Sequence, residues 1–169
     1  MGSGVSGLYS QGSGSQPYAP SYHVYSTMME ADKKDPDIYN PKTGYFKNPT
    51  ATNLESVIVD NKIKFNGHSA EGTMTYVLDN DNNIIFGKRN NPNNARKRAP
   101  HPTLIGGKDP QVQCAGMITF QKGKIRSVNA KSGHFRPSKK SLEKVDYILQ
   151  NLYEANPNLF HKDSKWRKQ

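Results

Sequence analysis

The sequence predicts an α+β domain in which an antiparallel sheet of four or more strands, formed by two hairpins, is packed by an N-terminal and a C-terminal helix. Two pairs of strand-like segments are each joined by turn-forming residues, and a helical apolar stripe follows them near the C-terminus. The 169 residues suit one hydrophobic core. We therefore expect a single catalytic-like domain over residues 21–160.

The two hairpins define the predicted sheet. In the first, residues 73–78 alternate in polarity and residues 84–86 are apolar, with an Asp/Asn-rich turn between them. In the second, residues 112–121 and 124–128 flank a Lys-Gly dipeptide, whose glycine supplies the positive φ of a tight turn.

A helix is predicted on each side of the hairpins in the sequence. Ser21 can cap the first, which carries apolar Val24, Met28 and Met29 and ends before Pro36. Ser138 can cap the second, which Asn156-Pro157 ends. The second helix has one apolar stripe, made of Leu142, Val145, Leu149 and Leu152.

The remaining segments are predicted to be two tails, two loops and one short helix. Residues 1–20 are rich in Gly, Ser, Gln and Pro and cannot bury enough apolar surface to fold, so they read as a flexible tail. Residues 39–49 and the basic segment 88–98 read as loops, 52–59 as a short helix, and 161–169 as a basic, solvated tail.

The net charge of +10 points to polyanionic partners, RNA among them. No run approaches the roughly 18 apolar residues of a membrane span, so we expect no membrane insertion and a soluble protein. The single cysteine, Cys114, is expected to be a small buried hydrophobe. The five histidines are scattered without metal-ligand spacing, and no phosphate-binding glycine motif occurs, so neither a metal nor a cofactor is expected.

Two histidines in glycine-rich and proline-rich stretches are the candidate catalytic residues. His101 lies between two prolines and ahead of Gly106-Gly107, whereas His134 follows a predicted strand in Ser-Gly-His-Phe-Arg-Pro. One histidine that removes a 2′-hydroxyl proton and another that protonates the leaving oxygen would cleave RNA without a metal. We assign the base to His134 and the acid to His101, with exchanged roles left open. The alternative is that both histidines only brace loops.

Further residues complete the predicted site. A cation would stabilise the transition-state charge, and Arg136, Lys131 and Arg126 can supply it. Thr103 or Ser132 can donate hydrogen bonds. Phe135 can stack a base, although a core position is the alternative. Basic residues that can hold phosphates, or simply face solvent, are Lys88, Arg89, Arg96, Lys97 and Arg98.

The segment His101-Pro-Thr-Leu-Ile-Gly-Gly107, then Ala115-Gly116, Gly123 and Ser132-Gly-His-Phe-Arg-Pro137, resembles a core segment of the plant IQ-motif-containing (IQM) proteins. There the motifs read His-Ser-Ser-Phe-Leu-Ala-Gly-Gly, Ala-Ala-Gly and Ser-Gly-His-Tyr-x-Pro. The resemblance covers about a quarter of the chain and implies a shared domain core. Since the IQxxxRGxxxxR segment is absent from this sequence, calmodulin binding is not implied.

Through Ser-Gln-Pro-Tyr-Ala-Pro-Ser-Tyr-His at residues 15–23, the chain also resembles the C-terminal toxin domains of bacterial polymorphic toxins, which are compact, basic and short. This resemblance implies a secreted bacterial effector that acts in the cytoplasm of a target cell, and an acidic immunity protein as its partner. Together with the paired histidines, it favours a metal-independent ribonuclease.

Two alternatives stay open at this point. An NAD-consuming or ADP-ribosyl-transferring toxin domain would need a glutamate, and Glu55, Glu71 and Glu143 are the candidates outside the tails. A non-enzymatic binding module for acidic partners would use the histidine motif only as structure.

Overall fold

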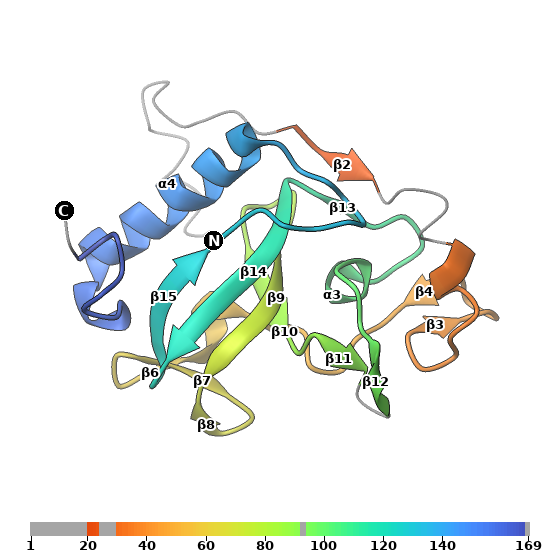
Figure 1. Cartoon of the computed structure of the whole chain (residues 1–169), viewed down its shortest axis with the longest axis horizontal. Coiled ribbons are helices and arrows are strands. Elements are labelled where there is room, and N and C mark those ends of the chain that lie inside the picture. The colour runs from red at the N-terminus through yellow and green to blue at the C-terminus, as the bar shows by residue number, and fades with distance from the viewer. Residues whose placement is uncertain (1–19, 24–29, 92–93, 168–169) are drawn as a thin grey trace.

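The computed structural model describes residues 20–23, 30–91 and 94–167, and it has the predicted α+β architecture (Figure 1). Its largest sheet is five-stranded, in the order β15-β14-β9-β10-β5, and every neighbouring pair is antiparallel. The strands are β5 (Thr52–Asn53), β9 (Gly72–Leu78), β10 (Ile84–Gly87), β14 (Cys114–Gln121) and β15 (Lys124–Val128).

Both predicted hairpins are confirmed. β9 and β10 pair in register from Ile84 opposite Leu78, and the side chain of Asp79 accepts the backbone N–H groups of Asp81 and Asn83 in the turn. β14 and β15 are joined by Lys122-Gly123, and both residues have positive φ, at 53° and 80°. The turn residues recognised in the sequence therefore account for two of the strand pairings in this sheet, β9 with β10 and β14 with β15.

The C-terminal helix is confirmed as α4 (Lys139–Ala155), with Ser138 at its N-cap position and Asn156 after its last residue. Its buried side chains Val145, Ile148 and Leu149 belong to the same core cluster as Tyr76 and Phe120 of the sheet. This face of the sheet holds the larger part of the hydrophobic core.

The expectation of a solvated C-terminal tail is wrong for Trp166, although the basic residues Lys162, Lys165 and Arg167 are exposed. After the 3-10 turn η2 (Pro157–Leu159), Phe160 packs against Trp166 with ring centroids 5.1 Å apart and ring planes tilted by 56°. Trp166 is only 2% exposed. Trp166 is therefore part of the hydrophobic core, although the residues next to it in the sequence are basic.

The N-terminal helix differs from its predicted bounds. Residues 22–23 form the strand β2 (Tyr22–His23), which pairs with β13 (Gln111–Val112). Helical backbone is described at residues 30–32, while Val24, Met28 and Met29 lie outside the described residues, as do residues 1–19 of the predicted tail.

Two predicted loops and one predicted short helix contain short strands. Residues 39–49 hold the hairpin of β3 (Tyr39–Asn40) and β4 (Tyr45–Phe46), and residues 88–98 hold β11 (Asn90–Asn91) and β12 (Asn94–Arg98). The predicted helix at 52–59 is only the 3-10 turn η1 (Leu54–Val57) between β5 and β6 (Ile58–Val59). β6 pairs with β7 (Lys62–Phe65), which pairs with β8 (His68–Ser69).

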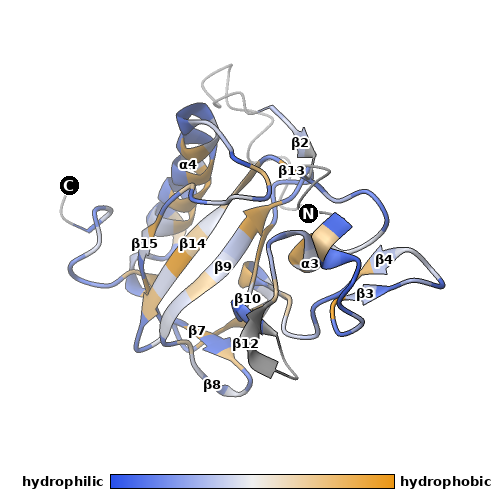
Figure 2. Ribbon diagram, turned by 45° about the vertical axis from the view of Figure 1, so that its right-hand side comes forward, coloured by the Kyte–Doolittle hydropathy of each residue, from blue (hydrophilic) through white to orange (hydrophobic). Residues whose placement is uncertain are grey.

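The second face of the sheet is covered at one end by the short helix α3 (Pro102–Ile105). A smaller core lies there, and Figure 2 shows α3 and α4 on different sides of β9 and β14. The members of this core are Val77, Leu104, Val112, Ala115 and Phe135. No helix among the described residues is long and apolar enough to cross a membrane.

Candidate functional site

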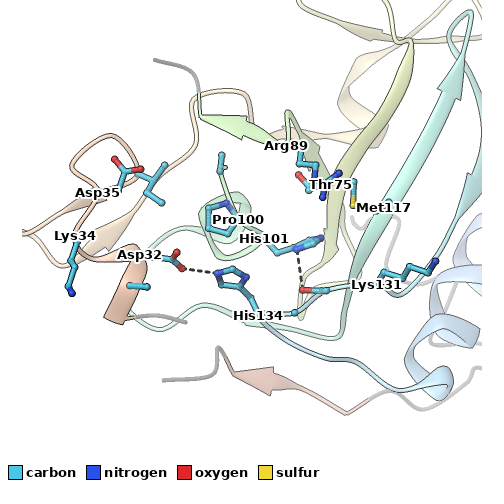
Figure 3. A pocket seen from close by; sticks show the side chains of 15 residues that line it. Asp32, Lys34, Asp35, Thr75, Arg89, Pro100, His101, Met117, Lys131 and His134 are labelled. Atoms are coloured by element: carbon cyan, nitrogen blue, oxygen red, sulfur yellow. Dashed lines mark hydrogen bonds and ion pairs between the residues drawn. The ribbon is translucent and has the colours of Figure 1, made fainter. Parts of the chain in front are cut away.

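A pocket of about 610 Å³ lies beside α3, between the segment of residues 31–38 and the loop of residues 131–134 (Figure 3). Residues 99–101 and Arg89 close it on other sides, and Thr75 of β9 and Met117 of β14 contribute from the sheet. Its volume falls within the range of about 300–1,000 Å³ that small-molecule sites occupy. Both histidines of the sequence motif line this pocket.

His134 is paired with a carboxylate that the sequence analysis missed. Its Nε2 lies 2.9 Å from Oδ2 of Asp32, and the two side chains are only 16% and 14% exposed. Since a carboxylate accepts, Nε2 carries the hydrogen and a neutral ring presents Nδ1 as an acceptor. Asp32 is separated by 102 residues from His134, and no motif around it signals the pairing.

His101 is held by protein groups at both ring nitrogens. Nε2–H donates to the carbonyl oxygen of Gly116 at 2.8 Å, so Nδ1 is the acceptor for the Ser132 hydroxyl at 3.1 Å. Burial lowers the pKa of His101 to about 4, an effect that the charges of His134 and Arg89 reinforce and the Gly116 hydrogen bond opposes. His101 is therefore neutral near pH 7, and the role of general acid predicted for it is not supported.

The glycine at position 116 is required by the loop that carries the site. A Cβ there would lie 2.0 Å from the backbone oxygen of Asn129. That same oxygen accepts the hydroxyl of Tyr76 at 2.7 Å, and the Asn129 side chain accepts the N–H groups of Met117 and Lys131. The close approach of Asn129 to Gly116 thus holds the loop 129–134 against the sheet.

Three residues proposed for chemistry make contacts within the protein, and Thr103 and Phe135 do not line the pocket. Thr103 is buried, donates to the carbonyl of Pro100 at 2.7 Å and accepts from Asn48. Phe135 is 1% exposed in the smaller core, so base stacking by this ring is not supported. Ser132 lines the pocket and, besides bonding His101, accepts the N–H of Phe135.

The predicted cations divide between the pocket and other surfaces. Arg89 and Lys131 line the pocket, as does Lys34, which the sequence analysis did not single out. Arg126 lies on β15, where it contacts Gln121 and Asp163. Arg136 is exposed and its Nε donates to the carbonyl of Gly133.

Of the remaining predicted phosphate-binding residues, only Lys88 has a described side chain. Lys88 is exposed and does not line the pocket. The side chains of Arg96, Lys97 and Arg98 lie outside the described residues.

The carboxylates of the pocket are Asp32 and Asp35, and none of Glu55, Glu71 and Glu143 lines it. Glu71 accepts the backbone N–H of Lys122 at the far end of β14. Cys114 is fully buried, as expected, and burial raises the pKa of its thiol to about 11. Among the described residues no cluster of three His, Cys, Asp or Glu could hold a metal ion.

Comparison with known proteins found no matching family model, no similar curated protein and no similar solved structure.

Proposed function

We propose that this chain is an enzyme that cleaves RNA without a metal ion, with His134 as the group that moves the proton. The observation that carries this proposal is the 2.9 Å pair of His134 and Asp32 in the wall of a cation-lined pocket. A histidine oriented by a carboxylate is a general base in a fixed tautomer. In this proposal only His134 transfers a proton, because both ring nitrogens of His101 are hydrogen-bonded to protein groups.

The proposed reaction uses the neutral form of His134. Its Nδ1 takes the proton of the ribose 2′-hydroxyl, the 2′-oxygen bonds to phosphorus, and the bond from phosphorus to the 5′-oxygen breaks. Solvent protonates the 5′-oxygen, and a 2′,3′-cyclic phosphate forms. Arg89 and Lys131 place positive charge in the same pocket, where it would stabilise the developing charge on the phosphate oxygens.

The biological setting that we propose is a secreted bacterial effector acting in the cytoplasm of a target cell, restrained by an acidic immunity protein. The net charge of +10 supports an acidic partner, since opposite charges steer association. Arg89 and Lys131 are exposed as well as pocket-lining, which makes the mouth of the pocket a suitable place for such a partner.

The direct experiment incubates the protein with total RNA and tRNA in EDTA. The wild type is expected to cleave, and His134→Gln is expected to be slower by a factor of about 10² to 10⁴. His68→Gln is the matched control, because His68 is exposed on β8 and lies outside the pocket. Intact RNA at stoichiometric wild-type protein would exclude the proposed reaction.

A second candidate is NAD consumption, including ADP-ribosyl transfer, favoured by the two carboxylates Asp32 and Asp35 within one nucleotide-sized pocket. A carboxylate next to a breaking glycosidic bond stabilises the cationic sugar that develops. Release of fluorescence from etheno-NAD, lost in Asp35→Asn but kept in His68→Gln, would decide for this candidate. A chain that is inactive in both assays would be a binding module instead.

A further inference from the structure

The floor of the pocket continues into a face of the sheet that the described residues leave uncovered. Thr75 and Met117, which line the pocket, are directly opposite each other on β9 and β14. Figure 3 shows them next to Arg89. Two residues further along each strand, about 7 Å away, the same face presents Thr73 and Thr119.

A row of three hydroxyl side chains crosses the sheet at that point. Thr119 is opposite Thr73 on one side and opposite Ser127 of β15 on the other. The Thr73 and Thr119 hydroxyl oxygens are 2.9 Å apart. Since neighbouring strands are about 4.8 Å apart, the row spans about 10 Å.

This face is solvated, unlike the opposite one. Thr73 and Ser127 are exposed and Thr119 and Met117 are half-buried, whereas their neighbours Met74 and Ile118 on the other face are in the main core. In Figure 2 the ribbons of β9 and β14 run in front, and α4 lies on the side behind them. Among the described residues, a row of hydroxyl donors is thus presented next to the pocket.

The charged side chains around this face indicate the kind of ligand that it binds. Exposed Arg89 and Lys131 mark the pocket end. At the other end exposed Lys122 follows the last residue of β14, next to the carboxylate of Glu71, which accepts its backbone N–H. The chain carries a net charge of +10. Cations at both ends of a row of neutral donors suit an extended polyanion with phosphates at regular spacing, because hydroxyls bond phosphate oxygens without adding charge.

We propose that single-stranded RNA lies across this face, from the pocket past Met117 to the row of Thr73, Thr119 and Ser127, which we name the hydroxyl row. The proposal rests on the proposed function in one respect: the cleaved nucleotide occupies the pocket while neighbouring nucleotides occupy the hydroxyl row. Residues of the hydroxyl row then bind substrate of several nucleotides and do not contact a dinucleotide.

The test measures binding and cleavage separately. Binding uses a labelled, uncleavable 2′-O-methyl RNA of about 12 nucleotides, followed by fluorescence anisotropy. Thr73→Glu with Ser127→Glu places two negative charges on the hydroxyl row. The matched control, Thr43→Glu with Ser56→Glu, adds the same charge at exposed positions that do not line the pocket.

The hydroxyl-row variant is expected to bind this RNA at least about tenfold more weakly than the control variant, which equals about 1.4 kcal/mol. Both variants are expected to cleave a dinucleotide at the wild-type rate, within about twofold. Equal binding by the two variants would overturn the proposal. So would an equal loss for the dinucleotide and the long RNA, since the effect would then act through the pocket.

Two further results distinguish failure of the RNA-binding proposal from misfolding of the glutamate variant and from failure of the proposed cleavage reaction. If the glutamate variant fails to fold by circular dichroism, Thr73→Lys with Ser127→Lys is expected to bind the RNA more tightly, and unchanged or weaker binding overturns the proposal. If the wild type binds the long RNA through the hydroxyl row but cleaves no RNA, the proposed reaction fails and the binding face stands.

Discussion

The imidazole of His101 joins strand β14 to the loop that carries His134, because its Nε2–H donates to the carbonyl oxygen of Gly116 at 2.8 Å. The other ring nitrogen accepts the hydroxyl of Ser132, two residues before His134. Through these two bonds a neutral, buried histidine fixes the position of the residue that we propose to act on substrate.

Replacing His101 is therefore expected to cost stability. His101→Ala removes both hydrogen bonds and leaves the Gly116 carbonyl without this partner, so a loss of about 2–4 kcal/mol in the free energy of unfolding is expected. Urea denaturation measures it. His134→Ala is the comparison: among the described residues its side chain hydrogen-bonds only Asp32, so this replacement is expected to cost less. Equal stability of His101→Ala and wild type would contradict the bracing role.

Acid is expected to destabilise the fold through the same residue. The pKa of His101 is about 4 in the folded chain and about 6.5 when unfolded, so the unfolded state binds more protons between these values. Its contribution to stability is complete above pH 6.5 and is lost as pH falls toward 4, by up to about 3 kcal/mol.

The measurement is the free energy of unfolding from urea curves between pH 4 and pH 7. His101→Gln should have a flatter dependence on pH than the wild type, because the other titrating groups are common to both. Parallel curves for the two proteins would show that His101 does not have this lowered pKa.

The glycine next to the site offers a steric test. A Cβ at Gly116 would overlap the backbone oxygen of Asn129 at 2.0 Å, so Gly116→Ala must displace the loop 129–134. We expect a cost of about 3 kcal/mol or more and a loss of activity. Gly67→Ala is the control: unlike Gly116, Gly67 has positive φ, at 79°, but its Cβ would meet no atom within 4 Å, so only about 1 kcal/mol of backbone strain is expected. Equal melting temperatures for the two variants would argue against the close contact.

Trp166 is expected to contribute to the core although it lies in a basic segment. It is 2% exposed and packs on Phe160, so Trp166→Ala should cost about 3–5 kcal/mol and Trp166→Phe much less. Because the chain has one tryptophan, its fluorescence reports this site alone. Emission typical of a solvated indole in the native protein would contradict the packing.

Local signals in the sequence were enough to predict the sheet hairpins and the C-terminal helix. Lys122-Gly123 and the turn at Asp79 fix short-range geometry, and the helical stripe around Val145 matches the face that is buried. These features depend on residues close together in the chain, so periodicity and turn chemistry report them.

The site was predictable only in part, since its decisive contacts are long-range. Both motif histidines do line one pocket, but the partner of His134 is Asp32, and nothing in the sequence around Asp32 distinguishes it from the other acidic residues. Arg136, predicted to stabilise the transition-state charge, is exposed, and its guanidinium bonds the Gly133 carbonyl. The burial of His101 and Phe135 likewise depends on how α3 packs on the sheet.

The central claim, that His134 moves a proton in RNA cleavage, is tested most directly by chemical rescue. The initial rate of cleavage of a dinucleotide is measured in EDTA for the wild type, His134→Ala and His101→Ala, with and without added imidazole. We expect His134→Ala to lose a factor of about 10² to 10⁴ and to regain activity in proportion to imidazole, because the small base can enter the vacated position. Imidazole should not restore His101→Ala. A folded His134→Ala that cleaves at the wild-type rate without imidazole would contradict the claim.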